Sequence, residues 1–406
     1  MPSRLTPIFA AATLWAAIVS ASAFAQEAEK APEPKKNDRG PVHLEPPSDD
    51  PNYLLMGEFA GPITVAENQY QTIGLQIRPL GENRFEAISY NGGLPGQKDH
   101  QGGPTRLIGM LANDLLVLSG APWAVLAQAD HCLIIGRGGE KLGRLERIVR
   151  RSPTLGAKPP AEAIVLFDGS GVDQFLDGKL SPEMLLMEGA TIKPMFQDFD
   201  LHLEYRLPYM PGARDQGRGN SGVYLQSRYE CQILDSFGDL PVFNGAGSLY
   251  RFRAPDLNMS LPPLTWQTYD IRFTAPRWGA DGKKLRNARI TTWLNGTIVQ
   301  NDVELPDKTG AGQIEEPNLL PIKLQNHSDP VRFRNIWIID RGLAHPTPFP
   351  VEGNGEVTPP APAPAPADAQ PADAKPSESK PSESKPADAN PADANPSQPS
   401  TEPVKS

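Results

Sequence analysis

Apolar and polar residues alternate with a period of two along the first half of the chain. TIGLQIRPL (72–80) and RFEAISY (84–90) alternate on either side of a Gly-Glu-Asn break, and RLIGML (106–111) and LLVLSG (115–120) alternate around Ala-Asn-Asp. Alternation places successive side chains on opposite faces of a strand, and the short polar breaks are typical of hairpin turns. With WAVLAQA and CLIIGR added, we predict a small all-β unit over residues 50–150, a barrel or sandwich of about six short strands.

A second series of short alternating runs occupies residues 162–345. The runs are separated by Gly, Pro, Asn or Asp, and they are AIVLFDG, DLHLEYRLP, GVYLQSR, YECQILD, YDIRFTA, ARITTWLNGTIV, PIKLQN and RFRNIWIID. The Asn-Gly pair in WLNGTIV is a strong hairpin signal. Because helical periodicity is nearly absent, these strands predict a two-sheet sandwich, so the fold class is all-β.

A segment rich in proline separates the two units. RRSPTLGAKPPAEA runs from residue 150 to 163 and interrupts the alternation. Such composition is typical of a connection between domains, and the roughly 290 residues between the two tails are more than one core usually serves. We therefore predict a linker over residues 151–161.

The start of the chain has the pattern of an export signal. Arg4 precedes an apolar run that ends in Ala-Phe-Ala at residues 23–25. This pattern predicts a signal peptide over residues 1–25 and export to the periplasm or the cell exterior. A membrane anchor is the alternative, because the run is nearly long enough to span a bilayer, but its serines and alanines favour cleavage. No later run is apolar enough to cross a membrane.

Two further segments are predicted to be disordered. Residues 26–49 are polar and proline-containing, and residues 352–406 repeat the units PADAK, PSESK and PADAN without an aromatic residue. Such segments bury too little apolar surface to offset the entropy of ordering. A tether to envelope material is the functional alternative for the C-terminal tail.

The net charge indicates which partners are expected, and the positions of the cysteines indicate whether a disulfide is expected. The formal net charge is −9 and no basic cluster stands out, so nucleic acid is not expected as a partner. Cys132 and Cys231 fall in different predicted units, which favours two buried free thiols over a disulfide. A neutral or polar ligand fits this composition better.

Several strands of the second unit carry ionic side chains on one face. In GNSGVYLQSRYECQILDSFG, Glu230 and Gln232 alternate with the apolar Cys231 and Ile233. The same pattern recurs in other strands, with His202, Glu204 and Arg206 in one, Lys323, Gln325 and His327 in another, and Arg332 and Arg334 in a third. An antiparallel sheet with one wet face has this alternation too. We expect instead that these side chains share one hollow, because Arg, His and Gln suit aligned hydrogen bonds to sugar hydroxyls.

The order of these motifs resembles a known family. LFDG, FDLHLEYRLP, GNSGVYL, YECQILDSFG, WQTYDIRFTAPR, NGTIVQNDVELP and LQNHSDPVRFRNIWI follow one another over about residues 162–340. In this order and spacing they resemble the 3-keto-disaccharide hydrolase family. The resemblance implies a concanavalin A-like jelly roll that binds its ligand on the concave face of one sheet. It also implies a sugar or glycan substrate.

A 3-keto sugar suggests a particular route of cleavage. The ketone acidifies the hydrogen on C2, so a base, a group that stabilises the enolate oxygen and an acid for the leaving group are needed. A retaining glycosidase would need two carboxylates roughly 5 Å apart. Gln232 supplies an amide where such enzymes of this fold place an acid, so Glu204 or Asp235 would have to supply the second carboxylate. We therefore expect that Glu230 and His327 share the acid and base work. The substrate-binding candidates are Glu204, Arg206, Asn220, Gln232, Asp235 and Arg334, and of these Arg206 or Arg334 would stabilise the enolate.

Two alternatives stay open at this point. A divalent metal could be held by His202, Glu204 or Glu230 with His327, although these residues do not have the close spacing that is typical of a metal-binding motif. The rival function is a non-catalytic, lectin-like module that binds glycans of the cell envelope. It stays open because a family resemblance predicts the fold more reliably than the activity.

Overall fold

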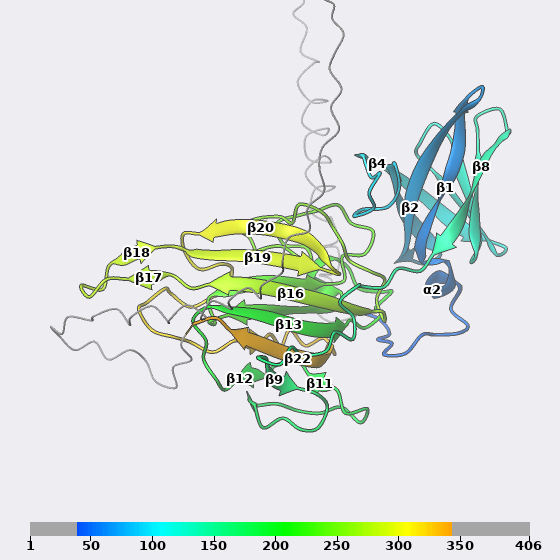
Figure 1. Ribbon diagram of the computed structural model, residues 1–406. Helices are drawn as coiled ribbons and strands as arrows, with labels where there is room; N and C mark the ends of the chain where they lie inside the picture. Colours follow the sequence, from blue (N-terminus) through cyan, green and yellow to red (C-terminus); the bar gives the residue numbers. More distant parts are fainter. Residues whose placement is uncertain (1–38, 343–406) are drawn as a thin grey trace, which may run out of the picture. The chain divides into compact units, whose positions relative to one another are not determined.

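The computed structural model describes residues 39–342 (Figure 1). The predicted signal peptide and C-terminal tail lie outside the described residues, as does most of the predicted linker 26–49. Within the described part, no helix is long and apolar enough to cross a membrane. The helices there are short: α2 (Pro51–Leu55) and the single 3₁₀ turn η1 (Asp215–Gly217). The prediction of an all-β protein is confirmed.

The first unit is a closed antiparallel barrel. Its strands are β1 (Gly57–Ala66), β2 (Gln69–Gly81), β3 (Arg84–Asn91), β4 (Gly102–Ala112), β5 (Leu115–Ser119), β6 (Ala124–Ala127), β7 (His131–Ile135) and β8 (Lys141–Ile148). The predicted hairpins β2–β3 and β4–β5 pair as expected. The barrel interior is filled by apolar side chains from alternate positions, Phe59, Leu75 and Leu107 among them.

The predicted count of about six strands is wrong because β1 and β8 were missed. Both contain a glycine that interrupts the alternation, and these glycines lie where the two strands pair and close the barrel. A Cβ atom on Gly61 would lie 2.5 Å from the carbonyl oxygen of Arg144, and one on Gly143 would lie 2.4 Å from that of Pro62. The same residues that hide the strands from a periodicity argument therefore allow their backbones to approach closely.

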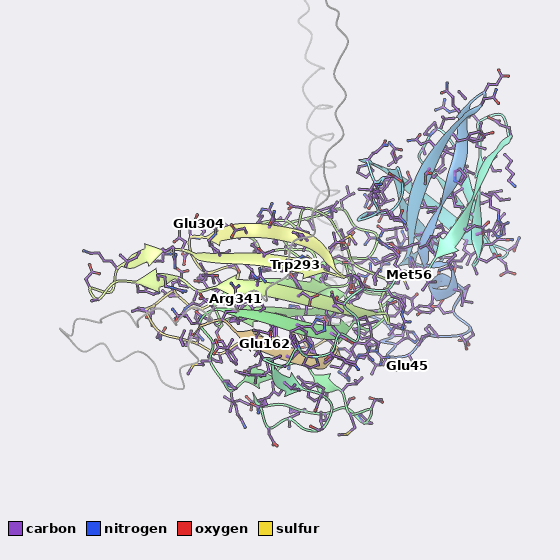
Figure 2. All side chains as sticks on the ribbon, viewed as in Figure 1. Glu45, Met56, Glu162, Trp293, Glu304 and Arg341 are labelled. Carbon is purple, nitrogen blue, oxygen red and sulfur yellow. The ribbon has the colours of Figure 1, made fainter. Side chains whose placement is uncertain are left out.

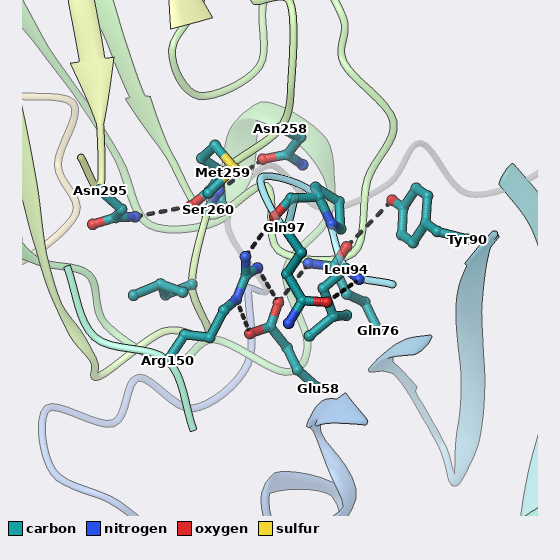
Figure 3. A network of polar contacts seen from close by, with 12 residues as sticks. Glu58, Gln76, Tyr90, Leu94, Gln97, Arg150, Asn258, Met259, Ser260 and Asn295 are labelled. Carbon is teal, nitrogen blue, oxygen red and sulfur yellow. Dashed lines mark hydrogen bonds and ion pairs between the residues drawn. The ribbon is translucent and has the colours of Figure 1, made fainter. Parts of the chain in front are cut away.

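A buried polar network lies at the barrel end of the chain connection (Figure 3). Glu58 on β1 accepts hydrogen bonds from Gln76 Nε2 at 2.8 Å and from Arg150 Nε at 2.7 Å. Tyr90 donates to Gln76 Oε1 at 3.3 Å. Arg150 also donates to the carbonyl oxygen of Pro95 at 2.6 Å. The last residue before the predicted linker is thus fixed to the barrel.

The second unit is a sandwich of two sheets. The smaller sheet has the strand order β10 (Phe175–Leu176), β12 (Thr191–Ile192), β21 (Lys323–Leu324), β14 (Asn220–Leu225) and β15 (Tyr229–Leu234). The larger sheet has the order β11 (Leu186–Met187), β22 (Arg332–Asp340), β13 (Phe199–Arg206), β16 (Trp266–Thr274), β19 (Ala288–Leu294) and β20 (Thr297–Leu305), with β9 (Ile164–Phe167) paired to β22 (Figure 1). The strands β17 (Arg277–Trp278) and β18 (Lys284–Arg286) form a separate hairpin.

One apolar core lies between the two sheets. It takes Leu201, Leu203 and Tyr205 from β13 and Tyr229, Cys231 and Ile233 from β15, among many others. Because side chains alternate along a strand, the residues between these positions point to the outer faces of the sandwich. The charged positions predicted from the sequence therefore belong to two outer faces, one on each sheet. Both cysteines are buried and unpaired.

The segment 151–161 is not a loose linker along its first half. Thr154 Oγ1 donates to Asp270 Oδ2 at 2.8 Å, and the backbone N–H of Gly156 donates to Glu204 Oε1 at 2.5 Å. Both acceptors lie on the outer face of the larger sheet. The segment therefore covers part of that face.

Candidate functional site

The outer face of the smaller sheet gathers one carboxylate and several amides. In the β14–β15 pair, Tyr224 lies opposite Glu230, and Gly222 lies opposite Gln232. On the other side of β14, Lys323 of β21 lies opposite Tyr224. These pairings place Glu230, Tyr224 and Lys323 in one row across three neighbouring strands.

Glu230 is a buried carboxylic acid with few compensating contacts. Its residue surface is only 2% exposed. Tyr224 Oη donates to Glu230 Oε2 at 2.7 Å, and Gln325 Nε2 lies 3.4 Å from the same tyrosine oxygen. Burial raises the pKa of Glu230 to about 7, although hydrogen bonds from Tyr224 and Gln325 oppose the rise. The carboxyl can therefore gain or lose a proton near neutral pH.

Two glycines make room for this carboxyl. A Cβ atom on Gly222 would lie 2.8 Å from Glu230 Oε1, and one on Gly310 would lie 2.6 Å from Oε2 and 2.7 Å from Tyr250 Cδ1. Gly310 also has a φ of +54°, which favours glycine. The loop that carries it is held over β15 by the hydrogen bond between the backbone N–H of Glu230 and Thr309 Oγ1, at 2.7 Å.

A cavity of about 430 Å³ opens beside Tyr224. Its walls include Thr191, Lys323, Gln325 and Asn326, with Ala311 and Gln313 from the loop after β20. This volume is in the range of small-molecule sites in proteins. Glu230 is not itself in the wall, but its hydrogen bond to Tyr224 places its carboxyl directly behind it.

Two amide oxygens on this face have no hydrogen-bond partner. Gln232 Oε1 and Gln325 Oε1 are buried and unpaired, while Gln232 Nε2 lies 3.3 Å from the side-chain oxygen of Asn220. A buried polar atom without a partner is costly and is uncommon away from functional sites. Both oxygens are acceptors that a hydroxyl-bearing ligand could satisfy.

Three more predicted residues lie on or beside the smaller sheet, away from the Glu230 carboxyl. Asp235 is fully buried and paired with Arg218 at 2.8 Å. His327 follows β21, is partly exposed, and lies 3.9 Å from Asp329, which accepts the backbone N–H of Asn220 at 3.0 Å. Because Asn220 lies four positions along β14 from Tyr224, Asn220, Asp329 and His327 mark one end of this face and Glu230 the other.

The expectation of one shared hollow is wrong for five of the predicted residues, all of which lie in the larger sheet. They are His202, Glu204 and Arg206 on β13 and Arg332 and Arg334 on β22. Their side chains point away from the core that separates the two sheets, so the structure does not bring them together with Glu230. Alternation gives the faces of each strand, but it does not say which strands share a sheet.

On the larger sheet, Glu204 is surrounded by donors. It accepts hydrogen bonds from Arg334 Nε at 2.7 Å, Asn335 Nδ2 at 2.9 Å and the Gly156 N–H at 2.5 Å. Burial alone would raise the pKa of Glu204, but these donors and the neighbouring His202 lower it to about 2.

His202 completes the cluster around Glu204. Its Nδ1 lies 2.6 Å from Asp270 Oδ1, and its Nε2 lies 3.8 Å from Glu204 Oε1. Burial tends to lower the pKa of His202, but hydrogen bonds to the two carboxylates raise it overall. This cluster is internally satisfied, which is typical of a structural ion network.

The second unit is similar in sequence to known proteins. Residues 162–339 match the family described as the 3-keto-alpha-glucoside-1,2-lyase-like domain. A solved structure of a putative glycosyl hydrolase from Parabacteroides distasonis is 32% identical, over 45% of this chain and 84% of that chain, with a TM-score of 0.41. Residues 162–339 belong to this family.

Two other results bear on the lyase-like domain. A second solved structure from Parabacteroides distasonis, also described as a putative glycosyl hydrolase, is 15% identical over 45% of this chain and 94% of that chain, with a TM-score of 0.32. No curated protein matches the chain.

The predicted metal ligands of the lyase-like domain lie on two different sheets. His202 and Glu204 are on the larger sheet, whereas Glu230 and His327 belong to the smaller one. Across residues 39–342, no group of three or more His, Cys, Asp or Glu side chains is arranged to hold a metal ion.

Sequence reasoning missed Tyr224 and Gly310. Tyr224 becomes visible only through its register with Glu230, which depends on the turn at Gln226 and Ser227, both with positive φ. Neither residue is one of the Gly, Asn or Asp residues that usually fill turn positions with positive φ. Gly310 lies about 80 residues after Glu230, and nothing in the local sequence connects the two.

Proposed function

We propose that the lyase-like domain cleaves glycosidic bonds of 3-keto-glycosides by C2 deprotonation, elimination and hydration. The observation that carries this proposal is the Glu230 carboxyl, buried behind a cavity wall with a pKa of about 7. A proton-transfer group poised near neutral pH is one of the groups that β-elimination requires. The family description and the names of the solved structures support a carbohydrate substrate.

Ionised Glu230 would act as the base through Tyr224, which lines the cavity: the tyrosine oxygen takes the proton from C2 of the sugar while the tyrosine hydroxyl proton passes to Glu230. The C2–H electron pair forms the enolate, with a C2–C3 double bond and the negative charge on the C3 oxygen. The enolate then collapses to restore the C3 ketone and form a C1–C2 double bond, and the C1–O bond to the aglycone breaks. The leaving oxygen takes a proton from the conjugate acid of Glu230 or from His327. Water then adds across C1 and C2, with its hydroxyl on C1 and a proton on C2. This step gives the free 3-keto sugar and returns the groups of the protein to their starting protonation states.

Groups of the smaller sheet would stabilise and orient the substrate. Lys323 lines the cavity one strand from Tyr224 and lies in the same row of the sheet as Glu230. We assign it the enolate oxygen, in place of Arg206 or Arg334 on the other sheet. The unpaired oxygens of Gln232 and Gln325 would accept hydrogen bonds from sugar hydroxyls.

A double-displacement mechanism is less well supported. It requires a second carboxylate roughly 5 Å from the first. Gln232, two positions from Glu230 on the same face, is an amide, and Asp235 is paired with Arg218. Elimination uses the groups that are present.

The test compares Glu230→Gln with the wild type on a synthetic 3-keto-glucoside with a chromogenic aglycone. We expect kcat to fall by about 10³-fold, since a general base typically contributes 10²–10⁴. Glu230→Gln should still bind the substrate with a similar Kd. Cleavage that survives the substitution would remove Glu230 from the chemistry.

The same assay addresses the rival, non-catalytic function. A wild-type protein that binds the keto-glucoside and its reduced glucoside equally, and cleaves neither, would be a glycan-binding module. A matched control is Glu204→Gln, which changes a buried glutamate of the other sheet and should leave kcat per folded molecule within about twofold.

We also propose that the protein acts outside the cytoplasm. The support is the charged start, apolar run and Ala-Phe-Ala end of residues 1–25. N-terminal sequencing of the protein from a periplasmic fraction should give a mature chain that begins at Gln26. Recovery of the intact N-terminus in the cytoplasm would contradict export.

A further inference from the structure

A second cavity, of about 420 Å³, lies on the outer face of the larger sheet. Its walls include Trp337, Asp270 and Trp293. Pro153 and Thr154, from the segment 151–161 that covers part of this face (the covering segment), also line the cavity. This face is separated from Glu230 by the whole core of the sandwich. The cavity is therefore distinct from the proposed cleavage site.

The sheet register arranges the floor of this groove. Trp337 on β22 lies opposite His202 on β13, which lies opposite Asp270 on β16, which in turn lies opposite Trp293 on β19. Adjacent strands are about 4.8 Å apart, so the two tryptophans lie about 14 Å apart in one row. Figure 2 marks Trp293 on this sheet. The span exceeds a single sugar ring and suits an extended ligand.

Trp337 presents carbon surface rather than its indole donor. The Trp337 ring stacks on His202 with centroids 4.9 Å apart and an angle of 18° between the planes. Its Nε1 atom is buried and has no hydrogen-bond partner, although the residue as a whole is partly exposed. The accessible part of the indole is therefore its carbon frame, a flat apolar surface on which a sugar ring can lie.

The charges in the groove are already matched with one another. Asp270 is paired with His202 at 2.6 Å, and Asp200 is paired with Arg272 at 2.9 Å and with Arg341 at 3.4 Å. No charged group of the cavity wall among the described residues is left without an opposite partner. A groove of this kind offers acceptors and donors but attracts no net charge.

We propose that this groove binds a neutral polysaccharide and holds the enzyme on its substrate source. The aromatic ends would stack on sugar rings, and the carboxylates of Asp200 and Asp270 would accept hydroxyl hydrogen bonds between them. This site is independent of the proposed cleavage reaction. A cleavage domain that also binds the polymer would stay close to the saccharides that the polymer releases.

A proline-rich peptide is the other ligand that aromatic grooves take. Recognition of polyproline by such grooves relies on aromatic donors to peptide carbonyls as well as on flat rings. The indole donor of Trp337 is buried, so this groove supplies stacking surface with carboxylate acceptors instead. That combination favours a hydroxyl-rich ligand.

The experiment measures retardation of the full chain in native gels that contain hydroxyethylcellulose, laminarin, soluble starch or polygalacturonate. We expect retardation by at least one of the three neutral glucans and none by the polyanion. Calorimetry with the hexasaccharide of the retarding glucan then gives Kd. Trp293→Ala should raise Kd about tenfold or more, as for an aromatic side chain that carries much of the binding energy.

Two variants make the result specific. Trp278→Ala removes a partly exposed tryptophan of the β17–β18 hairpin, outside the groove, and should leave Kd within about twofold. Glu230→Gln should also keep the affinity, which separates groove binding from binding at the cleavage site. Trp293→Ala should keep full activity on the small keto-glucoside.

Three outcomes would overturn the proposal. They are the absence of retardation by all three neutral glucans, an unchanged Kd in a folded Trp293→Ala protein, and saturable binding of a synthetic proline-rich peptide that Trp293→Ala abolishes. None of these outcomes would affect the cleavage assay, so failure of the groove proposal and failure of the proposed reaction can be told apart.

Discussion

Two buried glutamates on opposite faces of the same sandwich have opposite acidities. Glu230 has its pKa raised to about 7, whereas Glu204 has its pKa lowered to about 2. Both are 2% exposed or less. Burial pushes both upward, so the difference comes from the donors: Glu204 has Arg334, Asn335 and a backbone N–H, and Glu230 has chiefly one tyrosine hydroxyl.

The comparison separates a carboxylate that stays ionised from a carboxyl that can change its protonation state near neutral pH. A carboxylate that is fully satisfied gains nothing from a proton, and it stabilises the fold as long as it stays ionised. A carboxyl that is buried without compensation costs stability when ionised, and such groups concentrate at functional sites. Burial and charge alone would have ranked the two residues equally.

The largest expected effect on stability comes from removing the Glu204 carboxylate, whose hydrogen bonds and ion pairs are all made. Glu204→Gln should lower the free energy of unfolding at pH 7 by about 3–5 kcal/mol, because it leaves Arg334 and His202 without their buried partner. Urea unfolding followed by tryptophan fluorescence measures the change. A loss below about 1 kcal/mol would mean that the cluster is not the stabilising network inferred here.

The pH dependence sharpens the same contrast. The folded pKa of Glu204 lies below its usual 4.5, so its stabilisation is complete above about pH 4.5 and is lost as pH falls toward 2. The folded pKa of Glu230 lies above 4.5, so its contribution is complete below about pH 4.5 and is lost as pH rises through 7.

Glu230→Gln should therefore be more stable than the wild type at high pH. The shift of the pKa from 4.5 to about 7 corresponds to about 3 kcal/mol at pH 8. The gain should vanish at pH 4, where the wild-type carboxyl is protonated. Equal stability of the two proteins at both pH values, measured by urea unfolding, would show that Glu230 is not strained by burial.

A smaller effect is expected from Gly310→Ala. The added methyl group would crowd Glu230 Oε2 and Tyr250 at a position whose φ is +54°. We expect kcat/KM on the keto-glucoside to fall about 10–100-fold, because displacement of a catalytic group by about 1 Å has this cost. Gly282→Ala is the control, since Gly282 also has positive φ, at +73°, but has no atom within 4 Å of its Cβ position.

The smallest effect is expected from His327→Asn. His327 lies at the other end of the β14 face from Glu230 and is partly exposed, so a role as acid for the leaving group would lower kcat by about tenfold or less. A loss as large as that of Glu230→Gln would show that the two residues share the proton transfer equally. Steady-state kinetics on aglycones of different pKa would distinguish these cases.

Much of the fold could be predicted because alternation is a local signal. Hairpins such as β2–β3 and the long strands β13 and β16 follow from residues that are neighbours in the chain. The glycine-containing β1 and β8 were missed, and so were two-residue strands such as β10 and β12, which are too short to have a period.

The site was predictable only in part for a related reason. Glu230, Gln232 and Asn220 were found because their strands are adjacent in the sequence and in the sheet. The assignment of Arg334 and Glu204 to the same hollow failed because sheet membership depends on long-range pairing. The opposite pKa shifts depend on donors such as Gly156 and Asn335, which are far from Glu204 in the chain.

The covering segment has a practical consequence for how the lyase-like domain can be cut out of the chain. The family match begins at residue 162, but the contacts of Thr154 and Gly156 with Asp270 and Glu204 come from before that boundary. A fragment that starts at residue 162 would expose the Glu204 cluster to water and remove one wall of the tryptophan groove. A fragment that keeps the sandwich intact should therefore begin near Arg150, upstream of the first residue of the family match.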